Sequence, residues 1–191
     1  SEANLDKDEI LKLAIELEGH PDNVAPAIYG NMIIAFMEDG NLYHESIKVP
    51  EEIRFLAMVP DFELSTEKAR AVLPKEIPHK HGVFNVSRCA LLIAAFTKNN
   101  LDLVKAACKD KFHQDYRSHL INNYDDIVAY ANSLDSLGTF LSGAGPTIMT
   151  LAKDGDDEIL DKMKSYLAAL PDNWQILDLH CDPNGAYYKE V

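Results

Sequence analysis

A carboxylate, an imidazole and an amide lie close together near the start of the chain, at Glu18, His20 and Asn23. The segment lies between an expected helix and an expected strand, a junction where α/β proteins often place functional residues. Carboxylate oxygen suits a hard cation such as Mg²⁺, so Glu18 is a candidate metal ligand. Asn23 could then hold a hydroxyl substrate beside that cation.

The same segment also fits a purely structural loop. Asp22 and Asn23 are good turn and capping residues, and Pro21 and Pro26 fix the path of the backbone. His20 could serve as a general base or could simply hold the turn together. The residues alone leave these alternatives open.

A second group of residues could hold an anion. Thr66 and Arg70 are four residues apart and therefore share one face of a helix, and Arg117 is a further cation. Guanidinium groups recognise carboxylate or phosphate through paired hydrogen bonds. An exposed arginine is also common on a solvated helix face. Arg88 lies on an otherwise apolar helix, where a buried ion pair is the alternative to a binding role.

A glycine-rich turn follows far downstream, at residues 142–146. Gly143, Ala144 and Gly145 would let backbone amides approach a phosphate, because glycine lacks a Cβ and tolerates positive φ. The turn is neither a Walker loop nor a dinucleotide-binding fingerprint. By itself it also fits an ordinary tight turn.

Hydrophobic periodicity and capping signals predict the elements that position these groups. We expect helices at 6–18, from 65 or 66 to 73, and at 81–97, 101–109, 125–134 and 156–170. Three strands at 31–37, 42–49 and 53–59, with a turn at Asp39 and Gly40, suggest an antiparallel meander. Further strands are expected from Thr139 and at 147–152 and 175–180. The pattern indicates an α+β fold with a ferredoxin-like sandwich, and the first 60 residues could form part of a neighbouring module.

Composition narrows the class of protein. A formal charge of −13 over 191 residues opposes binding to nucleic acid or to an anionic membrane. Cys89, Cys108 and Cys181 are widely spaced, which favours reduced thiols and a cytoplasmic location over a disulfide framework or a zinc site. Neither a leader peptide nor a membrane span is expected.

Four segments together resemble a known family. They are EGHPDNVAPA at 18–27, STEKARAVLP at 65–74, FNVSR at 84–88 and LSGAGPT at 141–147. In this order they resemble the GHMP small-molecule kinases and, within that superfamily, the homoserine kinase family of threonine biosynthesis. The resemblance implies phosphorylation of the L-homoserine hydroxyl, with ATP and Mg²⁺ as cofactors.

The resemblance also assigns roles to matching residues. Glu18 corresponds to the Mg²⁺ ligand, with Glu16 as the alternative if the alignment shifts. The substrate-binding set is Asn23, Thr66, Arg70 and Arg117; of these, Asn23, Arg70 and Arg117 are also expected to be catalytic. Related kinases of the mevalonate type place an aspartate at the position of Asn23, so a dedicated carboxylate base is not expected here. Gly143, Ala144 and Gly145 correspond to a motif that lies against the ATP phosphates.

Family members run to roughly 300 residues, and their glycine-rich ATP loop would precede Ser1. We therefore expect a C-terminal fragment that is inactive in isolation. Residues 1–60 would belong to the ribosomal-S5-like N-terminal domain and residues 61–191 to the C-terminal domain. The alternatives are an amino-acid-binding module without catalysis, a GHMP kinase for another alcohol, and a structural role in dimerisation. A homodimer is compatible with the family resemblance.

Overall fold

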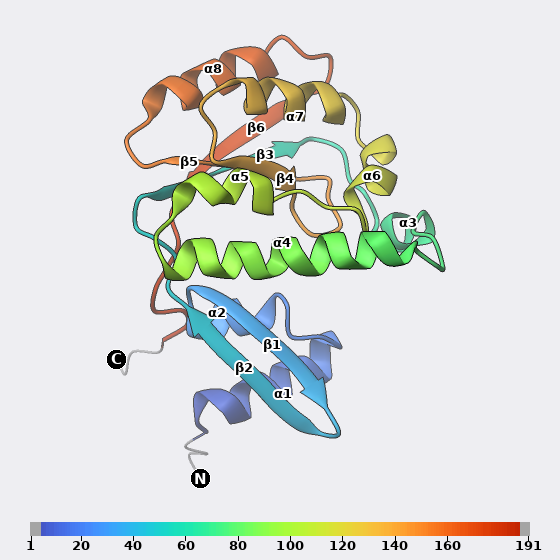
Figure 1. Ribbon diagram of the computed structural model, residues 1–191, viewed down its shortest axis with the longest axis vertical. Helices are drawn as coiled ribbons and strands as arrows, with labels where there is room; N and C mark the ends of the chain where they lie inside the picture. Colours follow the sequence, from blue (N-terminus) through green and yellow to red (C-terminus); the bar gives the residue numbers. More distant parts are fainter. Residues whose placement is uncertain (1–4, 188–191) are drawn as a thin grey trace. The chain divides into compact units, whose positions relative to one another are not determined.

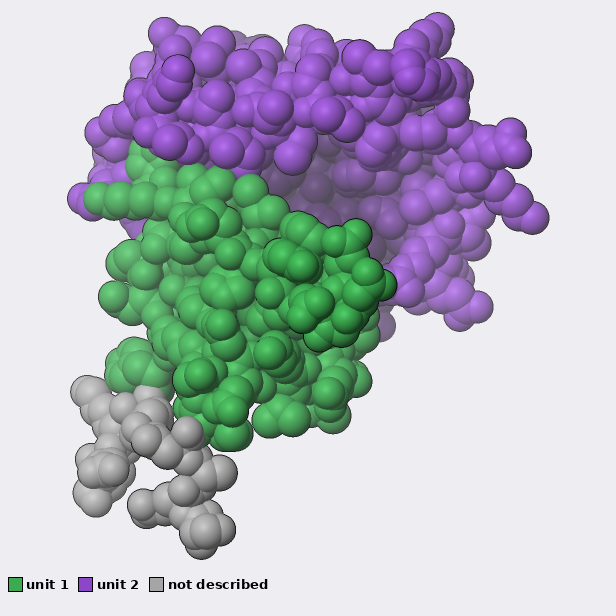
Figure 2. Space-filling model, turned by 60° about the horizontal axis from the view of Figure 1, so that its bottom comes forward, with its two compact units in different colours: residues 1–50, 181–191 green, residues 51–180 purple. Residues whose placement is uncertain are grey.

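The computed structural model describes residues 5–187. The chain divides into two compact units, which are described separately: unit 1 comprises residues 1–50 and 181–191, and unit 2 comprises residues 51–180 (Figure 2). Residues 1–4, part of the segment in which no leader peptide is expected, lie outside the described range. Among the described residues, no helix is both long enough and apolar enough to cross a membrane.

Unit 1 opens with the predicted helix, α1 (Lys7–Glu18). The Asp6 side chain accepts a hydrogen bond from the backbone of Glu9, and the Glu9 side chain accepts one from the backbone of Asp6. This reciprocal capping box satisfies amide groups that have no partner inside the helix. The helix ends at Gly19, whose φ of 92° is left-handed. Local signals therefore define both ends of α1.

A short helix and a hairpin complete the regular structure of unit 1. The helix is α2 (Val24–Tyr29), in a segment for which only a loop was expected; Pro26 fits its first turn, where an amide needs no helical partner. The hairpin joins β1 (Met32–Glu38) to β2 (Asn41–Ile47) through the predicted turn at Asp39 and Gly40, both with positive φ. The buried core comprises Leu11, Ile15 and Ala25.

The C-terminal segment belongs to unit 1, not to the unit that precedes it in the chain. The backbone N–H of Asn31 donates to the Asp182 carbonyl at 2.8 Å, and that of Ala186 donates to the Ala27 carbonyl at 2.8 Å. The compact units thus divide at 50/51 and 180/181, whereas a single boundary at 60/61 was expected. The assignment of residues 1–60 and 61–191 to the family's two domains stays a prediction.

Unit 2 is built on a four-stranded antiparallel sheet in the order β4-β5-β3-β6. Its strands are β3 (Ile53–Pro60), β4 (Gly138–Leu141), β5 (Ile148–Lys153) and β6 (Trp174–Leu179). The expected three-strand meander was wrong in one respect: β3 pairs with β5 and β6 instead of with β2. Most residues of β3 are buried, as a central strand covered on both faces requires, whereas most of β1 and β2 is exposed.

The helices of unit 2 cover both sides of this sheet. They are α3 (Thr66–Ala71), α4 (His79–Thr97), α5 (Val104–Ala107), α6 (Gln114–Arg117), α7 (Tyr124–Ser133) and α8 (Asp157–Leu167), with 3₁₀ turns at Leu101–Leu103 and Ser118–Leu120. Figure 1 shows α7 and α8 on one side of the sheet and α4 and α5 on the other. Strand order, α7 and α8 together match a split βαβ arrangement, so the expected ferredoxin-like α+β fold is confirmed.

The main core of unit 2 lies between the sheet and the pair α7 and α8. Leu56 and Met58 of β3 pack there with residues from the neighbouring strands and from both helices. The fully buried members are Leu56, Met58, Ile127, Ala131, Ile148, Ala152 and Met163. This apolar layer fixes the sheet from which the loops of the candidate site project.

One charged side chain is buried in the sheet of unit 2. Arg54 on β3 is 6% exposed and donates two hydrogen bonds of 2.6 Å to the Asp178 carboxylate on β6. It donates a third, of 3.0 Å, to Asp157 at the start of α8. The Arg54 hydrogen bonds outweigh partial burial and lower the pKa of Asp178. The sequence analysis did not single out this triad.

We expect Asp178→Asn to lower the free energy of unfolding by about 2 kcal/mol, because a buried guanidinium loses its main ionised partner. Asp157→Asn is the matched control and should cost under about 1 kcal/mol, since Asp157 is 77% exposed. Urea unfolding followed by circular dichroism measures both. The pKa of Asp178 is lowered in the folded state, so its ionised form stabilises the fold. Its contribution to the free energy of unfolding is therefore present above pH 3.8 and is lost as the pH falls further. Equal losses from the two variants would contradict this account.

Candidate active site

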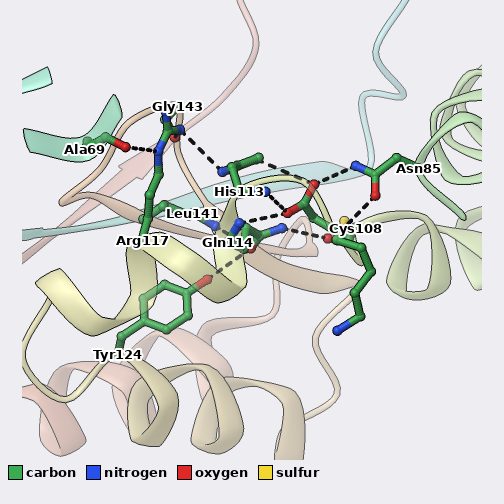
Figure 3. A network of polar contacts seen from close by, with 11 residues as sticks. Ala69, Asn85, Cys108, His113, Gln114, Arg117, Tyr124, Leu141 and Gly143 are labelled. Atoms are coloured by element: carbon green, nitrogen blue, oxygen red, sulfur yellow. Dashed lines mark hydrogen bonds and ion pairs between the residues drawn. The ribbon is translucent and has the colours of Figure 1, made fainter. Parts of the chain in front are cut away.

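Arg117 connects two of the segments that the sequence analysis singled out. It is the last residue of α6 and is half-buried. Its Nε donates to the carbonyl of Ala69 at 3.0 Å, and its Nη1 donates to the carbonyl of Gly143 at 3.0 Å (Figure 3). One guanidinium group thus bridges α3 and the glycine-rich turn.

Arg70 supplies a second positive charge near Arg117. Burial lowers the pKa of Arg117, and the charge of Arg70 lowers it further. Within residues 5–187, neither arginine has an ion-pair partner. Two nearby guanidinium groups without a carboxylate partner favour binding of an anion.

Thr66 lies one turn before Arg70 on α3, and both side chains are exposed. The helix begins at the predicted cap, where the Ser65 side chain accepts a hydrogen bond of 3.2 Å from the backbone N–H of Lys68. A hydroxyl and a guanidinium separated by four residues lie on one helix face. The structure therefore places Thr66, Arg70 and Arg117 on neighbouring elements of unit 2.

The glycine-rich turn connects β4 to β5. The N–H of Ser142 donates to the carbonyl of Thr147 at 2.9 Å, and the N–H of Gly145 donates to that of Ser142 at 3.0 Å. Gly143 and Gly145 have φ values of 56° and 83°, and Ala144 between them is half-buried. A Cβ at residue 143 would meet nothing within 4 Å, whereas one at residue 145 would lie 3.0 Å from the Leu141 side chain.

Three residues that the sequence analysis missed support Arg117: Asp110, His113 and Gln114. Nδ1 of His113 lies 3.4 Å from Nη1 of Arg117. Burial lowers the pKa of His113 below 6.5, and the charge of Arg117 adds to that effect while Asp110 opposes it. A neutral imidazole at pH 7 can accept a hydrogen bond from the guanidinium.

Gln114 ties α6 to the strand that leads into the glycine-rich turn. Its Oε1 accepts hydrogen bonds from the backbone N–H of Leu141 at 2.9 Å and from Tyr124 Oη at 3.0 Å. Its Nε2 donates to the carbonyl of Cys108 at 3.3 Å. One signal could have found this cluster: an acidic residue before a short helix, with His113 and Arg117 four residues apart.

Glu18 and Asn23 belong to unit 1. Glu18 is the last residue of α1 and Asn23 precedes α2; both side chains are exposed. Nδ1 of His20 contacts Oδ1 of Asp22, and the same carboxylate oxygen accepts a hydrogen bond of 3.0 Å from the backbone N–H of Asn23. Asp22 therefore orders the turn between α1 and α2 through its contacts with His20 and Asn23.

The described residues hold no group of three or more histidine, cysteine or acidic side chains arranged for a metal. Mg²⁺ keeps several waters and often takes one or two carboxylates together with substrate phosphates, so a single carboxylate can serve as its protein ligand. Glu18 has an exposed carboxylate, and its role as a ligand stays a prediction. Glu16 is also exposed but lies two residues earlier, so it points from a different side of α1.

Within residues 5–187, Arg88 forms no ion pair, the arrangement that was the alternative to a binding role. Its guanidinium lies 3.7 Å from the centre of the Phe84 ring, and its Nη1 donates to Ser87 Oγ at 2.9 Å. The Phe84 ring stabilises this half-buried cation, but Nε of Arg88 is buried without a hydrogen-bond partner among the described residues.

Comparisons with known proteins show what this fold is similar to. Residues 92–169 match the family described as GHMP kinases C terminal. The chain is similar to a homoserine kinase of Clostridium botulinum (strain ATCC 19397 / Type A), with 49% identity over 181 residues, which is 95% of this chain. The chain spans 61% of the length of that relative.

Solved structures of homoserine kinases also resemble this chain. A homoserine kinase from Cytophaga hutchinsonii superposes with a TM-score of 0.89 at 26% identity, covering 96% of this chain and 61% of that one. A putative homoserine kinase from Listeria monocytogenes gives a TM-score of 0.76 at 30% identity, covering 99% and 63% respectively. The expected resemblance to homoserine kinases and the fold class are thus confirmed.

We expect alanine to be tolerated less well at position 145 than at position 143. Both substitutions force a side chain into positive φ, a strain of about 1 kcal/mol, and Gly145→Ala adds contacts of 3.0 and 3.1 Å with Leu141 and Ile121. Urea unfolding of the two variants tests the difference. An equal loss of stability would contradict this prediction, because it would mean that the side chains around residue 145 move apart at little energetic cost.

Proposed function

We propose that the protein to which these residues belong transfers the γ-phosphoryl group of ATP to the side-chain hydroxyl of L-homoserine. The products are O-phospho-L-homoserine, an intermediate of threonine biosynthesis, and ADP. The observation that carries this proposal is the pair Arg70 and Arg117, two neighbouring cations without an acidic partner in the described range, in a chain similar to homoserine kinases. A cytosolic location and a homodimer stay predictions.

The arginine pair suits the carboxylate of an amino acid. Arg117 already donates from Nε and Nη1 to two carbonyl groups, which fixes its plane and leaves its remaining N–H groups for a ligand. Arg70 is exposed and can complete the site, with the Thr66 hydroxyl as an additional donor on the same helix face. Fixing the carboxylate would place the other end of homoserine, which carries the hydroxyl, at a set distance from the arginines.

For the substrate hydroxyl, the family resemblance assigns Asn23, which lies in unit 1. The Asn23 amide can accept a hydrogen bond from the hydroxyl and orient its oxygen, but it has no basicity with which to remove the proton. Nδ1 of His20 contacts the Asp22 carboxylate, which holds the imidazole in the turn. Positioning and charge neutralisation would therefore supply most of the catalysis, as phosphoryl transfer allows.

The family resemblance assigns Mg²⁺ to Glu18 of unit 1 and the ATP phosphates to the glycine-rich turn of unit 2. Mg²⁺, when bound, would neutralise charge on the phosphoryl oxygens, and Glu18 is the residue proposed to hold it. The open space beside Gly143 leaves room for a ligand to approach the backbone there. In the transfer, the bond from the homoserine oxygen to phosphorus forms, the bond from phosphorus to the leaving ADP oxygen breaks, and the hydroxyl proton is released to water.

We expect Arg70→Ala and Arg117→Ala each to weaken binding of L-homoserine to this chain by about 10- to 100-fold, the effect of losing a charged hydrogen bond. Isothermal titration calorimetry measures the affinity. Lys162→Ala is the matched control: it removes a cation of the same unit that pairs with Glu158, and the affinity should stay unchanged. The ligand 3-amino-1-propanol, which lacks the carboxylate, should bind no better to the original chain than to the variants. Retained binding in both site variants would contradict the proposal.

Turnover requires a second experiment. We expect a chimera that joins the unmatched part of the Clostridium botulinum homoserine kinase to this chain to release ADP only when homoserine and Mg-ATP are present. Asn23→Ala in the chimera should lower kcat, whereas this chain by itself should show no turnover. A chimera that binds homoserine without releasing ADP would favour the amino-acid-binding module instead.

A further inference from the structure

Arg117 lies on a helix that is too short to be stable by itself. The helix α6 comprises only Gln114–Arg117, and a single turn is unstable without outside contacts. The direction of the Arg117 guanidinium therefore depends on the groups that fix the start of this helix.

Asp110 is the main group that fixes it. One carboxylate oxygen accepts hydrogen bonds from the backbone N–H groups of His113 and Gln114, both at 2.7 Å. The other oxygen accepts one from Asn85 Nδ2 at 2.6 Å. The side chain is only 8% exposed. Burial alone would raise the pKa of Asp110, but these hydrogen bonds outweigh it and lower the pKa, so the group is ionised at neutral pH.

Asn85 connects this carboxylate to the longest helix of unit 2. It lies within α4, and its Oδ1 accepts a hydrogen bond of 2.8 Å from the backbone N–H of Lys111. The Asn85 amide thus contacts both the side chain of residue 110 and the backbone of residue 111. We call this pair the Asn85–Asp110 latch (Figure 3 labels Asn85). It fastens the start of α6 to a helix of 19 residues.

We propose that Asp110 is a positioning residue for the substrate carboxylate, acting through α6 on His113 and Arg117. The inference rests on the proposed function, because it takes Arg117 as the residue that binds the carboxylate. The latch sets the backbone of His113, whose Nδ1 lies 3.4 Å from the Arg117 guanidinium. It also sets Gln114, which holds the strand before the glycine-rich turn. Asp110 itself does not touch the substrate.

Asp110→Asn is the first test. The Nδ2 group of the new asparagine would face Nδ2 of Asn85, so two donors would meet and the hydrogen bond between residues 85 and 110 would be lost. The negative charge of residue 110 would be lost as well. We expect the affinity for L-homoserine, measured by calorimetry, to fall about tenfold. The guanidinium Nε–H resonance of Arg117, which is hydrogen-bonded to Ala69 in the original chain, should shift and exchange faster with water.

The double variant Asn85→Asp with Asp110→Asn is the matched rescue. The exchanged pair can remake every hydrogen bond of the latch: Asp at 85 accepts from Lys111 and from residue 110, and Asn at 110 accepts from His113 and Gln114. We expect homoserine affinity within about twofold of the original and a restored Arg117 resonance. An affinity that stays low although the resonance returns would overturn the proposal.

A double-mutant cycle separates positioning from a general loss of structure. If Asp110 acts through Arg117, Asp110→Asn should cause little further loss of affinity in a chain that already carries Arg117→Ala. Additive losses would overturn the proposal. An affinity that is insensitive to Arg117→Ala from the start would instead refute the proposed function. The Arg117 resonance still reports in that case whether the latch positions the side chain.

Discussion

Unit 2 depends on the ion triad that Arg54 forms inside the sheet. The triad links the central strand β3 to its neighbour β6 and to the first residue of α8, through Asp178 and Asp157. A buried guanidinium without ionised partners would be strongly destabilising, so these elements must assemble in one register. That register also fixes β4 and β5, and with them the turn that carries Gly143 and Gly145.

The candidate site residues Arg70 and Arg117 lie on short helices of unit 2, α3 and α6. Arg117 is at the end of a four-residue helix and Arg70 is near the end of a six-residue one, so neither gains much from helix formation itself. The position of Arg117 comes from its hydrogen bonds to the carbonyls of Ala69 and Gly143, and from those that the Asp110 carboxylate accepts at the start of α6. A guanidinium held in this way suits the proposed binding of an anion.

The sequence predicted most features that local signals control. The Asp6 cap defined the start of α1, the Asp39 and Gly40 pair gave the hairpin, and the glycine-rich turn fell where it was expected. The partners of β3 could not be read from its own residues, because β5 and β6 follow about 90 and 120 residues later and strand pairing at that distance leaves no local mark. Among candidate site residues, residue type and spacing singled out Thr66, Arg70 and Arg117, and the family resemblance assigned their roles. Asp110 and Gln114 escaped notice because their role lies in contacts with Asn85 and Leu141, which are distant in sequence.

The three cysteines differ in a way that bears on how the protein can be handled. Burial raises the pKa of Cys108 to about 12, and burial likewise raises the pKa of Cys181, so both thiols remain protonated near neutral pH. Cys89 is exposed on α4. A maleimide dye or spin label should therefore attach mainly at Cys89 on the folded chain. The exposed thiol thus offers an attachment point for a spectroscopic probe on the same helix as Asn85, without the removal of other cysteines.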